Sequence, residues 1–515
     1  MRFPRASGIL LHPTSLPGPG HVGSFGPAAL DFVDALARAG QAVWQFLPLG
    51  PTGYGNSPYQ ALSSFGGNPL LVSEEWLADA GLLERAPAPV STNPVDYERA
   101  AEEKVPRLHA AHAAFKSGAG PSELAGRYDA FREAEAAWVD DLALFLALKH
   151  RHGGKRWSEW PAELARRDAK ALEGARRELV TEIDRHRFTQ FLFFEHWGRV
   201  RERARERSIV LLGDLPIFVA EDSADVWAEP DLFDLDGDGR PRNVSGVPPD
   251  YFSATGQRWG NPLYLWDVHR ERGFDWWIRR IRATLAQCDR IRIDHFRAFA
   301  DYWEISADEE TAIAGRWLTG PGADFFDAVK AALGELPIVA EDLGSLGEEA
   351  FALRDRYEFP GMRVLQFGFA PDPKFDAHSP HQFVSNCVAY TGTHDNNTVV
   401  GWFRSATNTT IDASEHGALQ RRVLDYVGTD GTDIHWDLIR LALSSVADTA
   451  IVPVQDLLGL DGSARMNVPS RPDGNWVWRL GHNQFDDAAI DRLAHLTRIY
   501  GRWNDANPAA DGASS

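Results

Sequence analysis

The chain has 515 residues, and 44% of them are hydrophobic, so it can bury a sizeable core. It carries 53 Lys and Arg residues against 73 Asp and Glu residues, and this net charge of −20 argues against a nucleic-acid partner. No apolar run reaches the roughly 18 residues of a membrane helix, and residues 1–15 lack a signal-peptide pattern, so we expect no membrane partner and a cytoplasmic location.

Eight short apolar runs follow one another along the chain, and each ends in polar residues. They are nearly continuous in apolar residues rather than alternating, which is typical of parallel strands buried on both faces. Helical spacing separates several of them, as at Leu30, Val33 and Leu36, where Gly40 is a plausible stop. The predicted strands are 7–12, 42–49, 209–214, 290–294, 337–341, 363–369, 387–395 and 450–456.

Eight parallel strands with intervening helices predict an α/β fold, a (β/α)8 TIM barrel. We expect a single elaborated catalytic domain over 1–505, with no C-terminal β-sandwich domain, and a flexible tail at 506–515. The intervals of about 71–207 and about 216–272 are predicted to be insertions. The first is helical, and its aromatic stripe at 188–197 is expected to pack in the core. The second is loop-rich and is expected to cover the active site.

Three carboxylates, Asp294, Glu341 and Asp395, each end a predicted strand. In a barrel, side chains at the carboxyl ends of the strands converge on one mouth. A single carboxylate of this kind is usually a helix cap, but three on separate strands, each with His or Arg nearby, favour an active site. The set indicates a sugar-processing enzyme.

The strand period places Arg292 and Asp294 on the same side, because they are two residues apart. The guanidinium would keep Asp294 ionised, as a nucleophile for an anomeric carbon must be. A structural ion pair inside the barrel is the alternative, and it is less favoured because His295 follows immediately. Glu341 would then be the general acid, with its pKa raised by repulsion from the neighbouring carboxylate.

Asp395 would be a third group, which binds sugar hydroxyls and favours a distorted ring. Its segment, TGTHDNN, could also be a polar turn, and that alternative is serious for Asn396 and Asn397 alone. A second polar segment, Asp234-Leu-Asp236-Gly-Asp238, resembles the start of a calcium loop. Its twelfth position is Ser245 rather than Glu, so a turn is favoured over a weak calcium site. Neither cysteine belongs to a CxxC pair, so we expect no structural zinc site.

Long motifs in these regions resemble glycoside hydrolase family 77, the 4-α-glucanotransferases called amylomaltases or disproportionating enzymes. The resemblance extends from about residue 8 to residue 505, and the order of the motifs matches. The motifs are ILLHPTSLPGPG at 9–20, LPLGPTGYGNSPYQ at 47–60, GVPPDYFSATGQRWGNPLY at 246–264, RIDHFR at 292–297, AEDLG at 340–344, GTHDNNT at 392–398 and RMNVPSRPDGNWVWR at 465–479.

The resemblance implies a role for each matching position. Asp294 matches the nucleophile, Glu341 the general acid/base and Asp395 the transition-state stabiliser. The positions matching residues that flank the cleaved bond are Arg292, His295 and His394. Those matching sugar-binding residues are Ser57, Tyr59, Asp214, Gln257, Trp259 and Asn467, and those matching a loop over the bound glucan are Asp250, Tyr251 and Phe252.

The implied activity is retaining transfer of a segment of an α-1,4-glucan to the 4-hydroxyl of another glucan or glucose. The expected partners are α-1,4-glucans and maltooligosaccharides, and no metal or organic cofactor is required. Because hydrolysis uses the same carboxylates, an α-amylase-like retaining hydrolase is one alternative. A catalytically inactive glycan-binding barrel is another, and the intact Asp–Glu–Asp set argues against it. The oligomeric state does not follow from the sequence.

Overall fold

The computed structural model describes residues 3–88, 94–249, 253–344, 347–370, 373–405, 415–469, 471 and 473–506. Of the predicted tail at 506–515, only Ala506 lies within these ranges. None of the helices formed by the described residues is long and apolar enough to cross a membrane.

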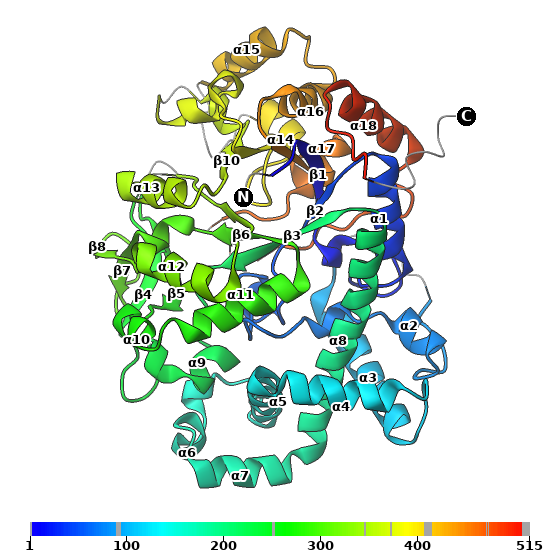
Figure 1. Cartoon of the computed structure of the whole chain (residues 1–515), viewed down its shortest axis with the longest axis vertical. Helices are drawn as coiled ribbons and strands as arrows, with labels where there is room; N and C mark the ends of the chain where they lie inside the picture. The colour runs from blue at the N-terminus through cyan, green and yellow to red at the C-terminus, as the bar shows by residue number, and fades with distance from the viewer. Residues whose placement is uncertain are drawn as a thin grey trace.

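Eight parallel strands form one sheet, in the order β10-β11-β12-β1-β2-β3-β6-β9. Strands β1, β2, β3 and β6 of this sheet are labelled near the middle of the molecule in Figure 1. Each of the eight strands overlaps one of the eight predicted intervals, which confirms the (β/α)8 barrel. Most of their residues are buried, as expected for strands covered on both faces. The strands are β1 (Ala6–Leu10), β2 (Val43–Gln45), β3 (Val210–Pro216), β6 (Arg290–Asp294), β9 (Ile338–Ala340), β10 (Gly361–Val364), β11 (Cys387–Tyr390) and β12 (Thr449–Pro453).

The barrel closes between β9 and β10. The backbone N–H of Ala340 donates to the carbonyl of Pro360 at 2.9 Å, and the carboxylate of Asp342 accepts from the N–H of Met362 at 2.6 Å. Gly361 is required here, because a Cβ at this position would lie 2.2 Å from Asp342 Oδ2. The residues on both sides of Glu341 therefore take part in the closure, which fixes the backbone of the predicted acid.

Helices cover the outside of the barrel, and α4 to α7 lie together at the lower end of the molecule in Figure 1. Helices α2 to α8 occupy the interval for which the sequence predicts a helical insertion. The helices are α1 (Pro27–Arg38), α2 (Glu74–Asp79), α3 (Tyr97–Lys116), α4 (Leu124–Ala134), α5 (Ala136–Arg151), α6 (Ala162–Ala165), α7 (Ala169–Glu178), α8 (Val180–Glu206), α9 (Ala224–Ala228), α10 (Trp266–Glu271), α11 (Asp275–Gln287), α12 (Gly322–Leu333), α13 (Glu348–Arg356), α14 (Val399–Arg404), α15 (His416–Val427), α16 (Ile434–Ser444), α17 (Val454–Leu457) and α18 (Asp487–Ile499).

The aromatic stripe of α8 packs in the core, as predicted. Phe188, Phe191 and Trp197 are at most 2% exposed. The ring of Trp197 lies 4.7 Å from that of Phe25 and 5.2 Å from that of Phe46, which belongs to the segment after β2. The aromatic side chains of helix α8 therefore pack in the hydrophobic core beside the barrel rather than in a ligand site.

A second sheet, which the sequence analysis did not predict, lies at the side of the barrel (Figure 1). It is antiparallel, has the order β5-β4-β7-β8, and follows strands β3 and β6 along the chain. The interval of about 216–272, predicted as loop-rich, contains two of its strands. These strands escaped prediction because they contain glycine and polar residues and lack a clear apolar alternation. The strands are β4 (Asn243–Val247), β5 (Gln257–Pro262), β7 (Asp301–Ser306) and β8 (Gly315–Thr319).

Candidate active site

The buried arginine Arg292 links two carboxylates at the mouth of the barrel. Arg292 and Asp214 are register partners on β6 and β3. Arg292 Nη1 donates to both oxygens of Asp214 at 2.8 Å and to Asp294 Oδ1 at 3.0 Å, so the predicted contact between Arg292 and Asp294 is present. The side chain of Asp294 is 30% exposed, whereas those of its two neighbours are buried. Asp294 is therefore held by Arg292 on its buried side, and part of its side chain is exposed at the mouth of the barrel.

Arg292 keeps its positive charge. Burial opposes it, but the carboxylates of Asp214 and Asp294 outweigh burial and hold the pKa of Arg292 well above its usual range. This guanidinium donates to Asp294 Oδ1 at 3.0 Å, and a charge-assisted hydrogen bond of this kind holds the carboxyl group in a fixed orientation. A fixed positive charge therefore orients the carboxyl group of Asp294, as a nucleophile at this position would need.

Glu341 follows directly after β9 and is held by two backbone N–H groups. It accepts from His295 N at 2.7 Å and from Leu343 N at 2.9 Å. His295 can donate in this way because its backbone is left-handed, with φ 50° and ψ 53°. Burial raises the pKa of Glu341 to about 7 against the opposing charge of Arg292 and the two N–H donors, and the charge of Asp294 adds to the rise. Like-charge repulsion, the cause predicted from the sequence, is therefore smaller than the effect of burial.

Two aromatic side chains enclose the same region. The rings of His295 and Trp259 meet edge to face, with centroids 4.9 Å apart. Burial lowers the pKa of His295 to about 4, so its imidazole is neutral at pH 7. Strand β5 carries Trp259 together with Gln257, and Trp259 Nε1 donates to Gln257 Oε1 at 3.3 Å. The second sheet thus supplies two of the predicted sugar-binding residues.

Tyr59 connects the strand ends on the other side of the mouth. Its hydroxyl lies 2.8 Å from Asp214 Oδ2 and 2.8 Å from His394 Nε2, and its ring stacks on that of His394 with an interplanar angle of 17°. His394 Nε2 lies 3.3 Å from Asp395 Oδ2. Ser57 lies in the turn before Tyr59, where its Oγ accepts from the Tyr59 N–H at 3.2 Å.

Asp395 does not end a strand, which corrects the sequence analysis. Strand β11 ends at Tyr390, and Asp395 lies in the loop that follows. Asn467 Nδ2 donates to Asp395 Oδ1 at 2.6 Å, and Arg465 Nη2 donates to the Asp395 carbonyl at 2.5 Å. Its position is therefore set by a distant segment of the chain, and its side chain is 44% exposed to the mouth.

Some predicted site residues are not placed, and one neighbour of the site was missed. Asp250, Tyr251 and Phe252 lie outside the described residues. His12, two residues after the end of β1, lines a cavity together with His394 and Arg465. Burial, with a smaller contribution from the charge of His394, lowers the pKa of His12 to about 3, so it is neutral. The sequence signal that could have identified His12 is its place as the last residue of the first predicted strand.

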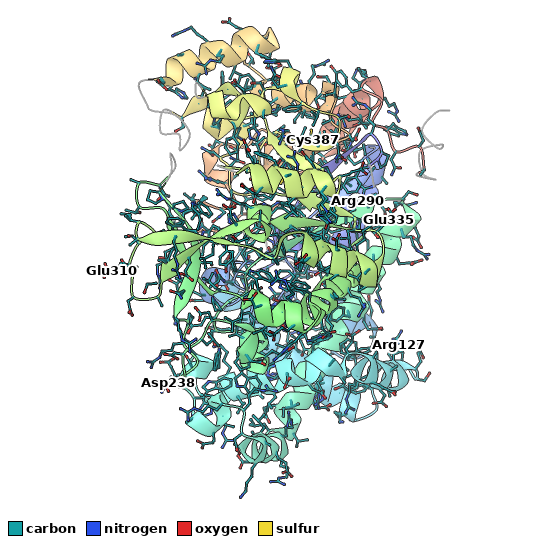
Figure 2. All side chains as sticks on the ribbon, turned by 60° about the vertical axis from the view of Figure 1, so that its left-hand side comes forward. Arg127, Asp238, Arg290, Glu310, Glu335 and Cys387 are labelled. Atoms are coloured by element: carbon teal, nitrogen blue, oxygen red, sulfur yellow. The ribbon has the colours of Figure 1, made fainter. Side chains whose placement is uncertain are left out.

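The Asp234–Asp238 segment forms the turn that the sequence analysis favoured. Asp236 Oδ1 accepts from the backbone N–H groups of Asp238 and Arg240, both at 2.9 Å. Asp238 itself lies at the surface (Figure 2). Asp234 accepts from the side chain of Asn243 at 2.8 Å. Within the part of the chain that the structure describes, no group of three or more His, Cys, Asp or Glu side chains could hold a metal ion.

The chain is similar to known proteins over nearly its whole length. The glycoside hydrolase family 77 model, described as 4-alpha-glucanotransferase, matches residues 11–483. The 4-alpha-glucanotransferase of Thermus thermophilus is 49% identical over 484 residues, which cover 93% of this chain and 95% of the relative. That of a Synechocystis species is 47% identical over 508 residues, which cover 97% and 98%. A solved amylomaltase from Streptococcus agalactiae in complex with acarbose has a TM-score of 0.91 at 38% identity and covers 97% of this chain and 100% of its own.

Proposed function

The chain belongs to the 4-alpha-glucanotransferases of glycoside hydrolase family 77, and from this premise we propose that Asp294 is its nucleophile, Glu341 its general acid/base and Asp395 its transition-state stabiliser. One observation carries the assignment: the two carboxyl groups come from adjacent strands and differ in surroundings, because Asp294 contacts the guanidinium of Arg292 whereas burial raises the pKa of Glu341. Ile293 and Ala340 are register partners, so Asp294 and Glu341, which follow them, extend from neighbouring positions on two strands whose backbones lie about 4.8 Å apart. Retaining glycosidic chemistry needs two carboxyl groups about 5 Å apart.

In the first step, the protonated Glu341 donates its proton to the departing glycosidic oxygen while Asp294 attacks the anomeric carbon. The glycosidic bond breaks, and a covalent β-glycosyl ester forms on Asp294. Asp395, exposed at the mouth and fixed by Asn467, is placed to hold sugar hydroxyls as the ring distorts. The proposed substrates are α-1,4-glucans and maltooligosaccharides.

In the second step, the 4-hydroxyl of another glucan replaces the departed chain. Glu341, now ionised, removes the proton of this hydroxyl, whose oxygen attacks the anomeric carbon and displaces Asp294. The product has a new α-1,4 bond with retained configuration. A pKa of about 7 suits both tasks, because the group can release and take up a proton near neutral pH.

Transfer requires that water be kept from the ester, and we assign this task to the hairpin formed by β4 and β5. Strand β5 places Trp259 against His295. A relay of hydrogen bonds holds the hairpin from behind: Trp303 Nε1 donates to the Ala312 carbonyl at 2.9 Å, and Ala312 N donates to the Thr255 carbonyl at 3.1 Å. The loop that contains Ala312 therefore supports the β4–β5 hairpin, and we call the two hydrogen bonds made by Ala312 the brace.

Trp303→Phe is expected to raise the hydrolysed share of the products by about two- to fivefold, because it removes the N–H of the brace and leaves a smaller aromatic ring in its place. The share is measured as the gain in reducing ends relative to the sugars formed by transfer. Trp317→Phe is the matched control, since Trp317 faces Trp303 across strands β7 and β8 and stacks on Arg297. An equal product ratio in the two variants would refute the brace.

Incubation with maltotriose tests the activity against both alternatives. A glucanotransferase produces glucose and longer maltooligosaccharides at a constant number of reducing ends. A hydrolase produces only shorter sugars with a rising number of reducing ends, and an inactive glycan-binding barrel leaves maltotriose unchanged. We further propose a cytoplasmic location, which is supported by the free, buried state of Cys288 and Cys387.

A further inference from the structure

Trp476 has an unusual backbone conformation beside the active site. Its φ is +65°, in the left-handed region that a bulky side chain adopts only when its surroundings force it to do so. The residue is 5% exposed, and its N–H donates to the carbonyl of Met466 at 2.7 Å. Such local strain, kept in a buried segment, requires an explanation.

The indole ring lies behind the pair of rings that connects the two sides of the mouth. Its centroid is 5.9 Å from that of Tyr59 and 6.0 Å from that of His394. These two residues contact Asp214 and Asp395, respectively. The left-handed turn thus places a large, rigid ring where it limits the movement of both.

The strained turn is held from outside the barrel by the helical segment. Tyr97, in the first turn of α3, donates its hydroxyl proton to the carbonyl of Trp476 at 2.9 Å. The N–H of Val95 donates to the carbonyl of Val477 at 2.7 Å. Because these contacts hold the two consecutive carbonyls of Trp476 and Val477, on the C-terminal side of the turn, the start of α3 is connected to the catalytic rings through Trp476.

We propose that Trp476 is a positioning residue that holds Tyr59 and His394 in their catalytic arrangement, and that Tyr97 fixes its backbone. The inference rests on the proposed roles of the mouth residues and extends them to the helical segment. Misplaced rings would bind the sugar in its ground state almost as well but would stabilise the transition state less. The loss therefore falls on kcat rather than on KM.

The test compares four variants with the wild type on maltotriose, with kcat, KM and the thermal midpoint measured for each. Trp476→Asn removes the ring and keeps a residue type that tolerates positive φ. Trp476→Phe restores a ring, and Tyr97→Phe removes only the hydroxyl. Tyr128→Phe is the matched control, because Tyr128 is a buried tyrosine of α4 whose hydroxyl donates to Asp184 at 2.7 Å, away from the site.

Trp476→Asn is expected to lower kcat by about 100-fold, the loss that follows a shift of about 1 Å in a catalytic group, with KM within about threefold of the wild type. Trp476→Phe is expected to recover most of the loss. Tyr97→Phe is expected to lower kcat by about tenfold, and Tyr128→Phe to lower the thermal midpoint without changing kcat.

A kcat for Trp476→Asn within about twofold of the wild type would overturn the inference. So would equal losses of kcat in the two tyrosine variants, because these would reflect stability alone. If Trp476→Asn does not fold, the comparison of Tyr97→Phe with Tyr128→Phe decides. Asp294→Asn is assayed alongside: its retained activity, or a wild type that fails to disproportionate maltotriose, would instead reject the proposed function.

Discussion

Asp294→Asn is expected to lower turnover of maltotriose by about four orders of magnitude or more while the fold remains intact. The amide has the shape of the carboxylate and can still accept from Arg292, which donates to Asp294 Oδ1 at 3.0 Å. It is not nucleophilic, however, so no glycosyl ester can form. The measurement is the rate of glucose release, with thermal unfolding as the check on the fold.

Asp289→Asn is the matched control for this variant. Asp289 immediately precedes β6 and accepts from the N–H of Leu211 at 2.8 Å, at the opposite end of the strand from Asp294. Its replacement is expected to affect stability and to leave turnover within about twofold of the wild type. Near-normal turnover in Asp294→Asn, or an equal loss in both variants, would reject Asp294 as the nucleophile.

The barrel and its two central carboxylates were predictable because their signals are local. Buried parallel strands leave nearly continuous apolar runs, and the period of two places Arg292 beside Asp294 whatever the loops do. The unpredicted strands β4, β5, β7 and β8 follow from contacts between distant segments. In β5, the contribution of Trp259 and Gln257 to the site can be recognised only in the folded protein, where Trp259 packs against His295 and donates to Gln257.

Other parts of the site depend on packing that no local pattern encodes. Asp395 was predicted at a strand end, but Asn467 and Arg465 fix it in a loop instead. The left-handed backbone of Trp476 has no sequence signal, because a bulky residue is the least expected one there. The pKa of Glu341 depends mainly on its depth of burial, which only the folded barrel sets.

Glu341→Gln is expected to reduce turnover of maltotriose by about three orders of magnitude or more, because the amide cannot protonate the departing sugar. A donor whose leaving group needs no proton, such as α-maltosyl fluoride, should restore the first step in this variant but not in Asp294→Asn. Glu335→Gln is the control, since Glu335 is an exposed residue before β9 (Figure 2) and is expected to retain full turnover.

The same substitution should change the pH dependence of stability. The folded-state pKa of Glu341, about 7, lies above its ordinary value of 4.5, so its contribution to stability is complete below pH 4.5 and is lost as the pH rises through 7. The wild type should therefore lose up to about 3 kcal/mol between pH 4.5 and 8 that Glu341→Gln does not lose. Denaturant unfolding at the two pH values measures the difference, and parallel curves would contradict the burial-raised pKa.

The stereochemistry of an azide product separates the roles of the two carboxylates. In Glu341→Gln, Asp294 still forms the β-glycosyl ester from α-maltosyl fluoride, and azide, which needs no general base, attacks the ester to give α-maltosyl azide. In Asp294→Gly, azide enters the space of the lost carboxylate and displaces fluoride directly, which gives the β-azide. The opposite pattern, or one anomer from both variants, would reject the assignment, because only a nucleophile on one face and an acid on the other can produce two different anomers.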